Sequence, residues 1–341
     1  MELLEDFILF DHQEDWENGN QVLYHNGLTD GLPVILPTRK KLEKMLETVS
    51  DKFKNYGLIP PLFREVTPTN VAYQAVLAGC QPEEFPVVLT AVAAALDPQF
   101  NLLGIQTTTG TTTTAVMVHG PITKRLGMNA GPNCLGPGNR VNACIGRAVQ
   151  LTMTNLGGAK PGTTDMATIG QPGKYTFCFA ESPNTSPIPF FHTRKGYKEN
   201  QSAVTVLGVS GTVEIVEMSS RPEAILLTLA GSLQNAGNIS ADRKYLGSGE
   251  LFILIPPEIM DALHKGGWNL DSIQQYVFQH AKVPLEKFSK ETQEQILESA
   301  VPIAKTPKDI YPIVSGGIGR KMTYLQTWAG GTDAITLPLV E

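Results

Sequence analysis

The sequence lacks any hydrophobic run long enough to form a membrane-spanning helix, and charged residues are scarce. Its 341 residues are 42% hydrophobic and 18% charged, a composition too apolar and too weakly charged for a disordered chain. A helix that spans a bilayer needs about 20 consecutive apolar residues, and no stretch approaches that length. We therefore expect a globular protein of one or two domains that has no membrane partner.

Paired cysteines are also missing. The four cysteines are widely separated, with neither a Cys-x-x-Cys pair nor the Cys/His spacing of a zinc site, so we expect free thiols and no structural zinc. No His/His or His/Glu pair stands at metal-binding spacing, and neither a metal nor another cofactor is predicted. The first residues lack the pattern of a secretory signal, which favours a cytoplasmic protein. The net charge of -6 excludes a generally basic nucleic-acid-binding protein.

Acidic residues are absent from one long internal stretch, since neither Asp nor Glu occurs between Asp97 and Asp165. The stretch does contain five basic residues, Lys124, Arg125, Arg140, Arg147 and Lys160. Where water is excluded, fixed cations and unpaired backbone N–H groups attract an anion. Two interpretations stay open: the stretch binds an anion, or it is a buried segment whose basic residues pair with carboxylates from elsewhere.

Helical and strand patterns alternate along the chain. Apolar residues recur at helical spacing after Thr38, and Pro68 and Pro82 each stand at the start of a predicted helix. The threonine-rich run at 105–118 and the alternating segment at 174–181 favour strands. The order of elements predicts an α/β or α+β fold, with a mixed sheet, flanking helices and glycine-rich loops at strand ends.

The expected domain organisation is simple. Residues 1–36 are predicted to be an irregular N-terminal segment, because turn signals dominate there. Residues 37–341 are predicted to form the catalytic or binding region, either as one unit or as two subdomains divided near 200–220.

A loop from Asn129 to Asn139, rich in Gly, Asn and Pro, is the most informative local pattern. It leads into a helix predicted to run from about Arg140 to Leu156, with Asn139 as its cap. Small residues let the backbone approach a ligand, and arginines supply charge for a carboxylate or phosphate. A second glycine loop at 315–319 follows an apolar strand, and the two loops together suggest one anion pocket.

The predicted substrate-binding residues come from these two loops and the helix between them: Asn133, Asn139, Arg140, Asn142, Arg147, Gly316, Gly317, Gly319 and Arg320. The glycine spacing fits neither the dinucleotide nor the P-loop pattern, so a nucleotide cofactor is not supported. The alternative interpretation of the first loop is a turn-rich crossing between two packed elements.

Five residues are candidates for the chemistry itself: Cys80, His119, Lys174, Cys178 and Glu181. A thiol needs a nearby cation or helix N-terminus to ionise, and free cysteines are more often inert core residues. Glu181 ends a predicted strand and could serve as a general acid or base. Along a regular strand Lys174 and Cys178 share a face, whereas Glu181 points to the other face unless a bulge intervenes.

Two further groups have the right chemistry for proton transfer. Asp165 is a second carboxylate candidate, and His192 lies in a Phe-Phe-His run. Both His119 and His192 are candidate acid/base groups or metal ligands. A satisfied, partly buried histidine is the more frequent situation.

Five segments, taken as a set, resemble the long component of the UGSC-type (seleno)protein family, over about residues 28 to 319. They are Gly31–Thr38, Ala78–Cys80, Gly136–Gly138, Asn142–Arg147 and Gly170–Glu181. In that family the component resembles a chain found beside, or fused to, a short domain with a U/C-Gly-Ser-Cys motif. This sequence has no Cys-Gly-Ser-Cys, so the resemblance implies that the short domain is a separate partner subunit or is absent.

The leading hypothesis is an enzyme, or the large subunit of one, that binds a small carboxylate-bearing anion. It would cleave or hydrate a carbon–heteroatom bond as a lyase or hydrolase, by acid/base or cysteine chemistry. One alternative is a thiol-dependent oxidoreductase subunit that acts with a UGSC-type partner, and another is a non-catalytic assembly subunit. An oligomer is expected in each case.

Overall fold

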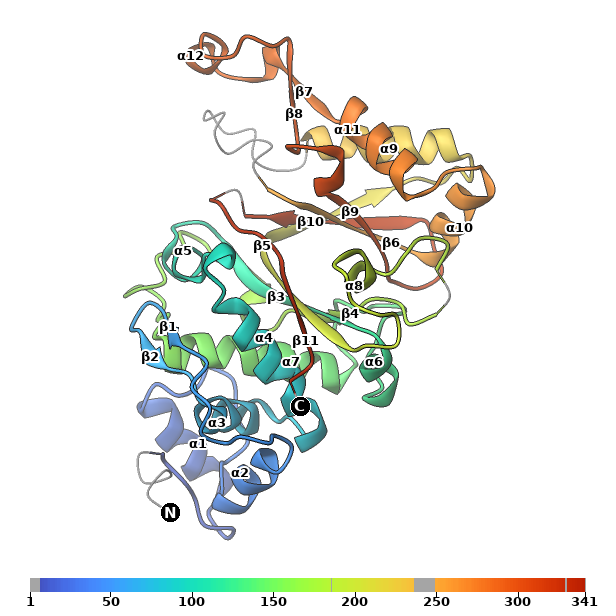
Figure 1. The fold of residues 1–341 in the computed structure, drawn as a ribbon. Helices are drawn as coiled ribbons and strands as arrows, with labels where there is room; N and C mark the ends of the chain where they lie inside the picture. Colours follow the sequence, from blue (N-terminus) through green and yellow to red (C-terminus); the bar gives the residue numbers. More distant parts are fainter. Residues whose placement is uncertain (1–6, 185, 236–248, 329, 341) are drawn as a thin grey trace.

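A mixed sheet of seven strands runs through the protein, and helices cover its outer faces (Figure 1). The computed structural model describes residues 7–184, 186–235, 249–328 and 330–340. The strand order is β4-β3-β5-β10-β6-β9, with β11 paired to β5. The β3/β4 and β6/β9 pairs are parallel, and the other pairs in this sheet are antiparallel. The predicted mixed sheet with flanking helices is therefore confirmed.

The strands of this sheet have the following bounds: β3 (Thr113–His119), β4 (Cys178–Ala180), β5 (Ala203–Val216), β6 (Leu251–Ile255), β9 (Ile310–Val314), β10 (Lys321–Thr327) and β11 (Ile335–Pro338). Two small antiparallel pairs lie apart from it: β1 (Leu58–Ile59) with β2 (Arg64–Glu65), and β7 (Lys282–Pro284) with β8 (Ala300–Pro302). The α-helices are α1 (Trp16–His25), α2 (Arg39–Leu46), α3 (Pro68–Ala78), α4 (Phe85–Ala95), α5 (Leu102–Thr107), α6 (Pro121–Arg125), α7 (Arg140–Leu151), α8 (Phe191–Arg194), α9 (Pro222–Asn235), α10 (Pro257–Lys265), α11 (Leu270–His280) and α12 (Lys290–Gln293).

Local capping explains where several helices begin. The Thr38 hydroxyl accepts a hydrogen bond from the Lys41 backbone N–H, and the Thr67 hydroxyl caps α3, whose first residue is proline. Asn139 caps α7 in the same way, as its position predicts. A six-residue π-helix (Thr152–Gly157) continues α7 to Gly158, which has a left-handed backbone. The predicted helix from 140 to about 156 is thus confirmed.

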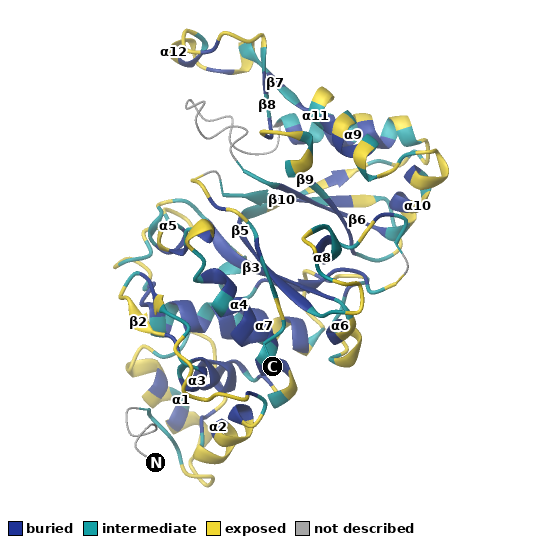
Figure 2. Cartoon of the chain, in the orientation of Figure 1, coloured by how far each residue is buried: buried dark blue, intermediate teal, exposed yellow. Residues whose placement is uncertain are grey.

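Strands β3, β4 and β6 and the first half of β5 are buried throughout (Figure 2). Successive side chains of such a strand alternate between the cores on its two faces. On β3, Val116 and Val118 pack with the helices α2, α3, α4 and α7 of the N-terminal half. Ala115 and Met117 face the opposite core, which also contains Phe252 of β6. His119 follows in the alternation, so it lies on the side of this second, inner core. Short α8 covers the same side between the two halves of the sheet (Figure 1).

Strand β5 links the two halves of the molecule. Its first half pairs with β3 and its second half with β10. Val204 and Val206 belong to the core of the N-terminal half, whereas Ile215 belongs to a separate core with α9, α10 and α11. The division predicted near 200–220 therefore falls inside one continuous strand, at the point where one core gives way to the other.

Several predicted elements differ from the structure. The predicted irregular segment 1–36 contains the ten-residue helix α1, capped by Asp15, although Asn18-Gly19 within it and Asn26-Gly27 after it are typical of turns. The strand predicted at 174–181 is confined to β4, since Pro172–Lys174 forms a 3-10 turn, η5. Strand β10 carried no clear signal in the sequence.

In the described part of the chain, no single helix is both long and apolar enough to cross a membrane. One bent pair, Pro82–Ala95 with Pro98–Thr107, passes the length and composition test only when its two helices are taken together. Most of α4 in this pair is buried in the N-terminal core.

Candidate active site at the carboxyl ends of β3 and β4

Two parallel strands bring a histidine and a glutamate together. His119 is the last residue of β3, and Glu181 directly follows β4. Because the strands run in the same direction, their carboxyl ends meet at one edge, where α/β sheets commonly hold their ligands. The backbone N–H of Glu181 donates to the Val118 carbonyl (3.0 Å), which extends the pairing by one residue and fixes the start of the glutamate side chain.

The Glu181 carboxylate is buried and fully engaged. Its Oε2 lies 2.7 Å from Nδ1 of His119, and the side chains are 3% and 0% exposed. Both carboxylate oxygens also accept from the backbone N–H of Phe191, at 2.9 and 3.0 Å. The other ring nitrogen of His119 lies 2.8 Å from the hydroxyl of Thr205 on β5. These contacts hold both side chains in one orientation.

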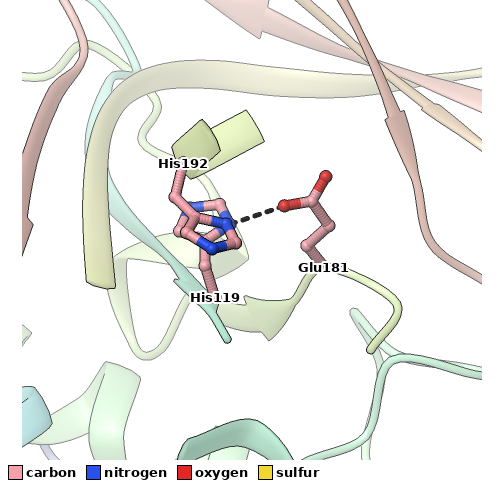
Figure 3. Close-up of side chains that lie close together, drawn as sticks. All are labelled: His119, Glu181 and His192. Carbon is pink, nitrogen blue, oxygen red and sulfur yellow. Dashed lines mark hydrogen bonds and ion pairs between the residues drawn. The ribbon is translucent and has the colours of Figure 1, made fainter. Parts of the chain in front are cut away.

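His192 is the third member of the site, and its ring nitrogens have only weak contacts, with the backbone of Lys198 and Glu199. Its ring stacks on His119 with centroids 5.4 Å apart (Figure 3). The Phe190 ring stacks on His192 at 6.0 Å. His192 is 1% exposed, yet neither ring nitrogen makes a hydrogen bond of normal geometry to a described residue. An unpaired buried imidazole is costly, so a bound molecule is the natural partner for it.

Burial also sets the protonation of His192. Desolvation, and then the neighbouring His119, lower the pKa of His192 below its ordinary value, while Glu181 and the backbone of Lys198 and Glu199 act in the opposite direction. The ring is therefore neutral at pH 7. A neutral imidazole is the form that can accept a proton or bind a metal ion.

A buried cation compensates the carboxylate. Arg194, at the end of α8, donates through Nε to the Pro189 carbonyl, and its two terminal nitrogens are buried with no partner among the described residues. Burial lowers the pKa of Arg194 to about 10, and the charge of Glu181 opposes that shift. Arg194 thus stays charged at neutral pH and balances Glu181 in the protein interior.

A small cavity of about 180 Å³ opens on this group. Its wall includes Glu181, Ser182, His192, Lys124 and Glu199. Lys124 is exposed and has no carboxylate of a described residue within 4 Å, so its ammonium is available to a ligand at the mouth. The cavity therefore combines a neutral imidazole and a carboxylate in its depth with a cation at its rim.

Among the described residues, the side chains of His119, Glu181 and His192 form a group that could bind a metal ion. One ligand atom each from His119, Glu181 and His192 lie within 4.8 Å of one another, and His₂Glu is a known set for catalytic zinc. Both nitrogens of His119 already have partners, however. A metal ion would have to replace the His119–Glu181 hydrogen bond, so only His192 is ready to bind one.

No protein-family model, curated protein or solved structure matches the chain. The resemblance to the UGSC-type family therefore stays a prediction.

The structure does not place Lys174 beside Glu181, contrary to the expected combined site. Lys174 lies in η5, before β4, where its ammonium contacts both oxygens of Asp165 at 2.7 and 2.6 Å. Glu181 follows the other end of β4. Lys174 and Glu181 line two different cavities, because they lie at opposite ends of strand β4.

The cysteines are not activated as the thiol hypothesis requires. Burial raises the pKa of Cys80, and the charge of Glu84 raises it further. Burial and Glu84 likewise raise the pKa of Cys178. Neither residue lines the cavity beside His192. Both candidates therefore carry protonated thiols in the core at neutral pH.

The two arginines of the expected anion pocket are paired within the protein. Arg140 contacts the buried carboxylate of Glu84 and donates to the Gly79 carbonyl. Arg147 binds both oxygens of Asp30 at 2.8 Å. For these residues the alternative interpretation is correct, since carboxylates from outside the acid-free stretch neutralise them.

The two glycine loops do meet, but not around a charged pocket. The Gly316 N–H donates to the Ala130 carbonyl at 2.9 Å, and a β-carbon on Gly317 would overlap Pro132. The hollow beside the first loop is lined by uncharged residues only, among them Asn139.

The remaining predicted binding residues stabilise these loops. The Asn133 side chain donates to the Pro137 carbonyl, and Asn142 donates to the carbonyls of Asn129 and Cys134. The Gly319 N–H donates to Glu258, which also pairs with Arg320. The contacts of these residues are thus within the protein, and they stabilise the two loops.

Sequence reasoning missed how Thr205 and Arg194 contribute. Thr205 lies in the middle of an ordinary β-branched strand, and Arg194 in a short polar segment after the Phe-Phe-His run. Nothing in the first pattern indicates that Thr205 contacts His119, and nothing in the second indicates that Arg194 is buried near Glu181. His192 was recognised as a candidate, and the prolines before α8 were the only local signal for an unusual loop.

Proposed function

We propose that the chain is an enzyme that performs acid/base chemistry on a small carboxylate-bearing molecule, in the cavity at the carboxyl ends of β3 and β4. The reaction class is cleavage or hydration of a carbon–heteroatom bond, of the lyase or hydrolase type. The observation that carries the proposal is His192, a buried neutral imidazole that lines the cavity and whose two nitrogens make no hydrogen bond of normal geometry to a described residue.

Each group has a role that follows from its contacts. In cleavage, His192 takes a proton from the substrate carbon, or from an attacking water, and gives it to the heteroatom that leaves. In hydration, it takes a proton from water as the water oxygen bonds to one carbon of a double bond, and gives it to the other carbon. Glu181 offers a negative potential that stabilises the imidazolium formed in this step, since it is one of the charges acting on His192. His119 is a positioning residue that holds the carboxylate through the 2.7 Å contact. Lys124 binds the substrate carboxylate at the rim.

A proton-exchange assay tests this role directly. A panel of small hydroxy-, amino- and unsaturated carboxylates is incubated with the protein in D₂O, and deuterium incorporation and product formation are followed by NMR. We expect at least one compound to react. His192→Asn should lower its rate about 100-fold or more, the usual contribution of a general base.

The matched control is His264→Asn, the same change at an exposed position of α10, which should react as wild type does. Equal rates for wild type and His192→Asn would refute the role of His192. A panel in which nothing exchanges would exclude small carboxylates as the substrate class.

A metal-assisted hydrolase is the second candidate, favoured by the close approach of ligand atoms from His119, Glu181 and His192. It ranks second because the His119–Glu181 hydrogen bond must open. Metal analysis of the purified protein, with activity measured before and after chelation, separates the candidates. The acid/base enzyme keeps its rate when the metal is removed.

The family resemblance supports one further proposal, a separate UGSC-type subunit. A thiol-dependent reaction would then draw its reactive sulfur from that partner, since Cys80 and Cys178 are buried here with raised pKa values. Co-purification from the native host tests for the partner. If the chain were only an assembly subunit, His192→Asn would leave the activity of the complex unchanged.

A further inference from the structure

A second and larger cavity lies at the opposite ends of β3 and β4. Its volume is about 790 Å³, within the range of about 300–1,000 Å³ that is usual for small-molecule sites. Thr112–Thr114 at the start of β3 and Lys174 just before β4 both line it. The seven residues of β3 separate it from the cavity at His192 by about 20 Å, at ~3.3 Å per residue. The two cavities share no lining residue.

The charges on this wall do not cancel. Asp30 is neutralised by Arg147, with contacts of 2.8 Å, and Asp165 by Lys174. Lys160 is then left as a cation on the wall with no carboxylate of a described residue within 4 Å. The larger cavity therefore carries one uncompensated positive charge, and it comes from the acid-free stretch of the sequence.

The surroundings of Lys160 are polar but uncharged. Its ammonium donates to the Gly27 carbonyl and, at 3.2 Å, to Oδ1 of Asn155. An ammonium has three protons to donate, so one is left for a ligand. Burial and the nearby cation of Arg64 lower the pKa of Lys160, and an anion bound beside it would oppose that shift.

A second polar group on the wall also lacks a partner. Thr112 is 1% exposed, and its hydroxyl has no hydrogen-bond partner among the described residues. A buried hydroxyl without a partner destabilises the folded chain by about 1–3 kcal/mol. The Thr112 hydroxyl and the Lys160 ammonium line the same cavity. Both groups can donate a hydrogen bond, so a ligand that accepts hydrogen bonds would fit between them.

We propose that this larger cavity is a second binding site, for a small organic molecule that bears a carboxylate or phosphate. The oxyanion accepts from the Lys160 ammonium, and a polar group of the same ligand pairs with the Thr112 hydroxyl. The site goes beyond the acid/base function, since it uses none of the residues of the other cavity.

Calorimetric titration of the full chain tests the site. The probes are inorganic phosphate, a small dicarboxylate such as succinate, and a sugar phosphate, so that the two sources of the oxyanion are compared. We expect at least one probe to bind with millimolar or better affinity. Lys160→Met should weaken this binding about tenfold or more, since among the described residues of the wall it removes the one cation without a carboxylate partner.

A second variant separates loss of binding from loss of folding. Thr112→Val keeps the shape of the side chain and removes a hydroxyl that has no partner, so the folded protein should be at least as stable as wild type. It should still bind the organic probe more weakly. Lys265→Met, the same change at an exposed lysine of α10 that lines neither of these cavities, is the matched control and should bind as wild type does.

Two results would overturn the proposal. One is the absence of binding by all probes at millimolar concentration. The other is binding that survives in Lys160→Met and Thr112→Val. If binding were lost instead in Lys124→Met, the anion would occupy the cavity beside His192, which would support the proposed function while refuting this second site.

Discussion

Replacing Glu181 by glutamine should destabilise the protein although the side chain keeps its shape. The carboxylate accepts from the Phe191 N–H and contacts His119 Nδ1, all in the interior. A hydrogen bond to a charged group contributes about 1 kcal/mol more than a neutral one, so the two partners together lose about 2 kcal/mol in Glu181→Gln. Arg194 also loses the negative charge that opposes the lowering of its pKa.

Truncation at the same position should cost more. Glu181→Ala leaves the Phe191 N–H and one His119 nitrogen buried without partners, at about 1–3 kcal/mol each, for a total of about 4 kcal/mol. The predicted order of unfolding free energies is therefore wild type, then Glu181→Gln, then Glu181→Ala.

Urea unfolding monitored by circular dichroism at neutral pH measures these differences, provided that the slope of free energy against urea stays constant across the variants. The matched control is Glu199→Gln. Glu199 lies on the rim of the same cavity, is exposed and has no ion pair with a described residue, so its change should stay within about 0.5 kcal/mol. Should Glu181→Gln unfold at the urea midpoint of wild type, the buried hydrogen-bond network would not have the strength argued for it.

Three further predictions follow from the same structure. Since the pKa of His192 is lowered from 6.5, the unfolded chain takes up its proton at a higher pH than the folded one, so stability falls as the pH drops below 6.5. His192→Asn should flatten that part of the curve of unfolding free energy against pH, and an unchanged curve would contradict the lowered pKa. Iodoacetamide at neutral pH should leave Cys80 and Cys178 unmodified in the native protein and label them in urea, as mass spectrometry of peptides would show. Arg147→Met should lower the unfolding free energy by about 3 kcal/mol, because its carboxylate partner stays largely buried and unpaired, whereas Lys308→Met in an exposed pair should change it by less than about 0.5 kcal/mol.

Helix starts could largely be predicted, because the residues that cap a helix are close to it in the sequence. Thr67 with Pro68, and Asn139 before Arg140, mark helix starts through hydrogen bonds between residues three positions apart. β10 escaped prediction because its pattern is weak and its partners, β5 and β6, are distant in the chain.

The candidate site was predictable only in part. His119 and Glu181 could each be proposed from strand ends, since both follow apolar segments. Their 2.7 Å contact depends on the parallel pairing of β3 with β4, which 58 residues separate. Lys174 could not be excluded beforehand, because its neighbourhood reads as a regular strand while Pro172 starts a turn there.

The acid-free stretch separates what the sequence determines from what the tertiary structure decides. The sequence alone determined that this stretch is positive and that it contains a capped helix, since composition and capping are properties of neighbouring residues. Only the tertiary structure decided which cations stay uncompensated. Arg140 and Arg147 meet carboxylates from distant segments, whereas Lys160 meets only neutral oxygens. Charge compensation depends on distances across the fold, and those distances arise only when the sheet brings remote segments together.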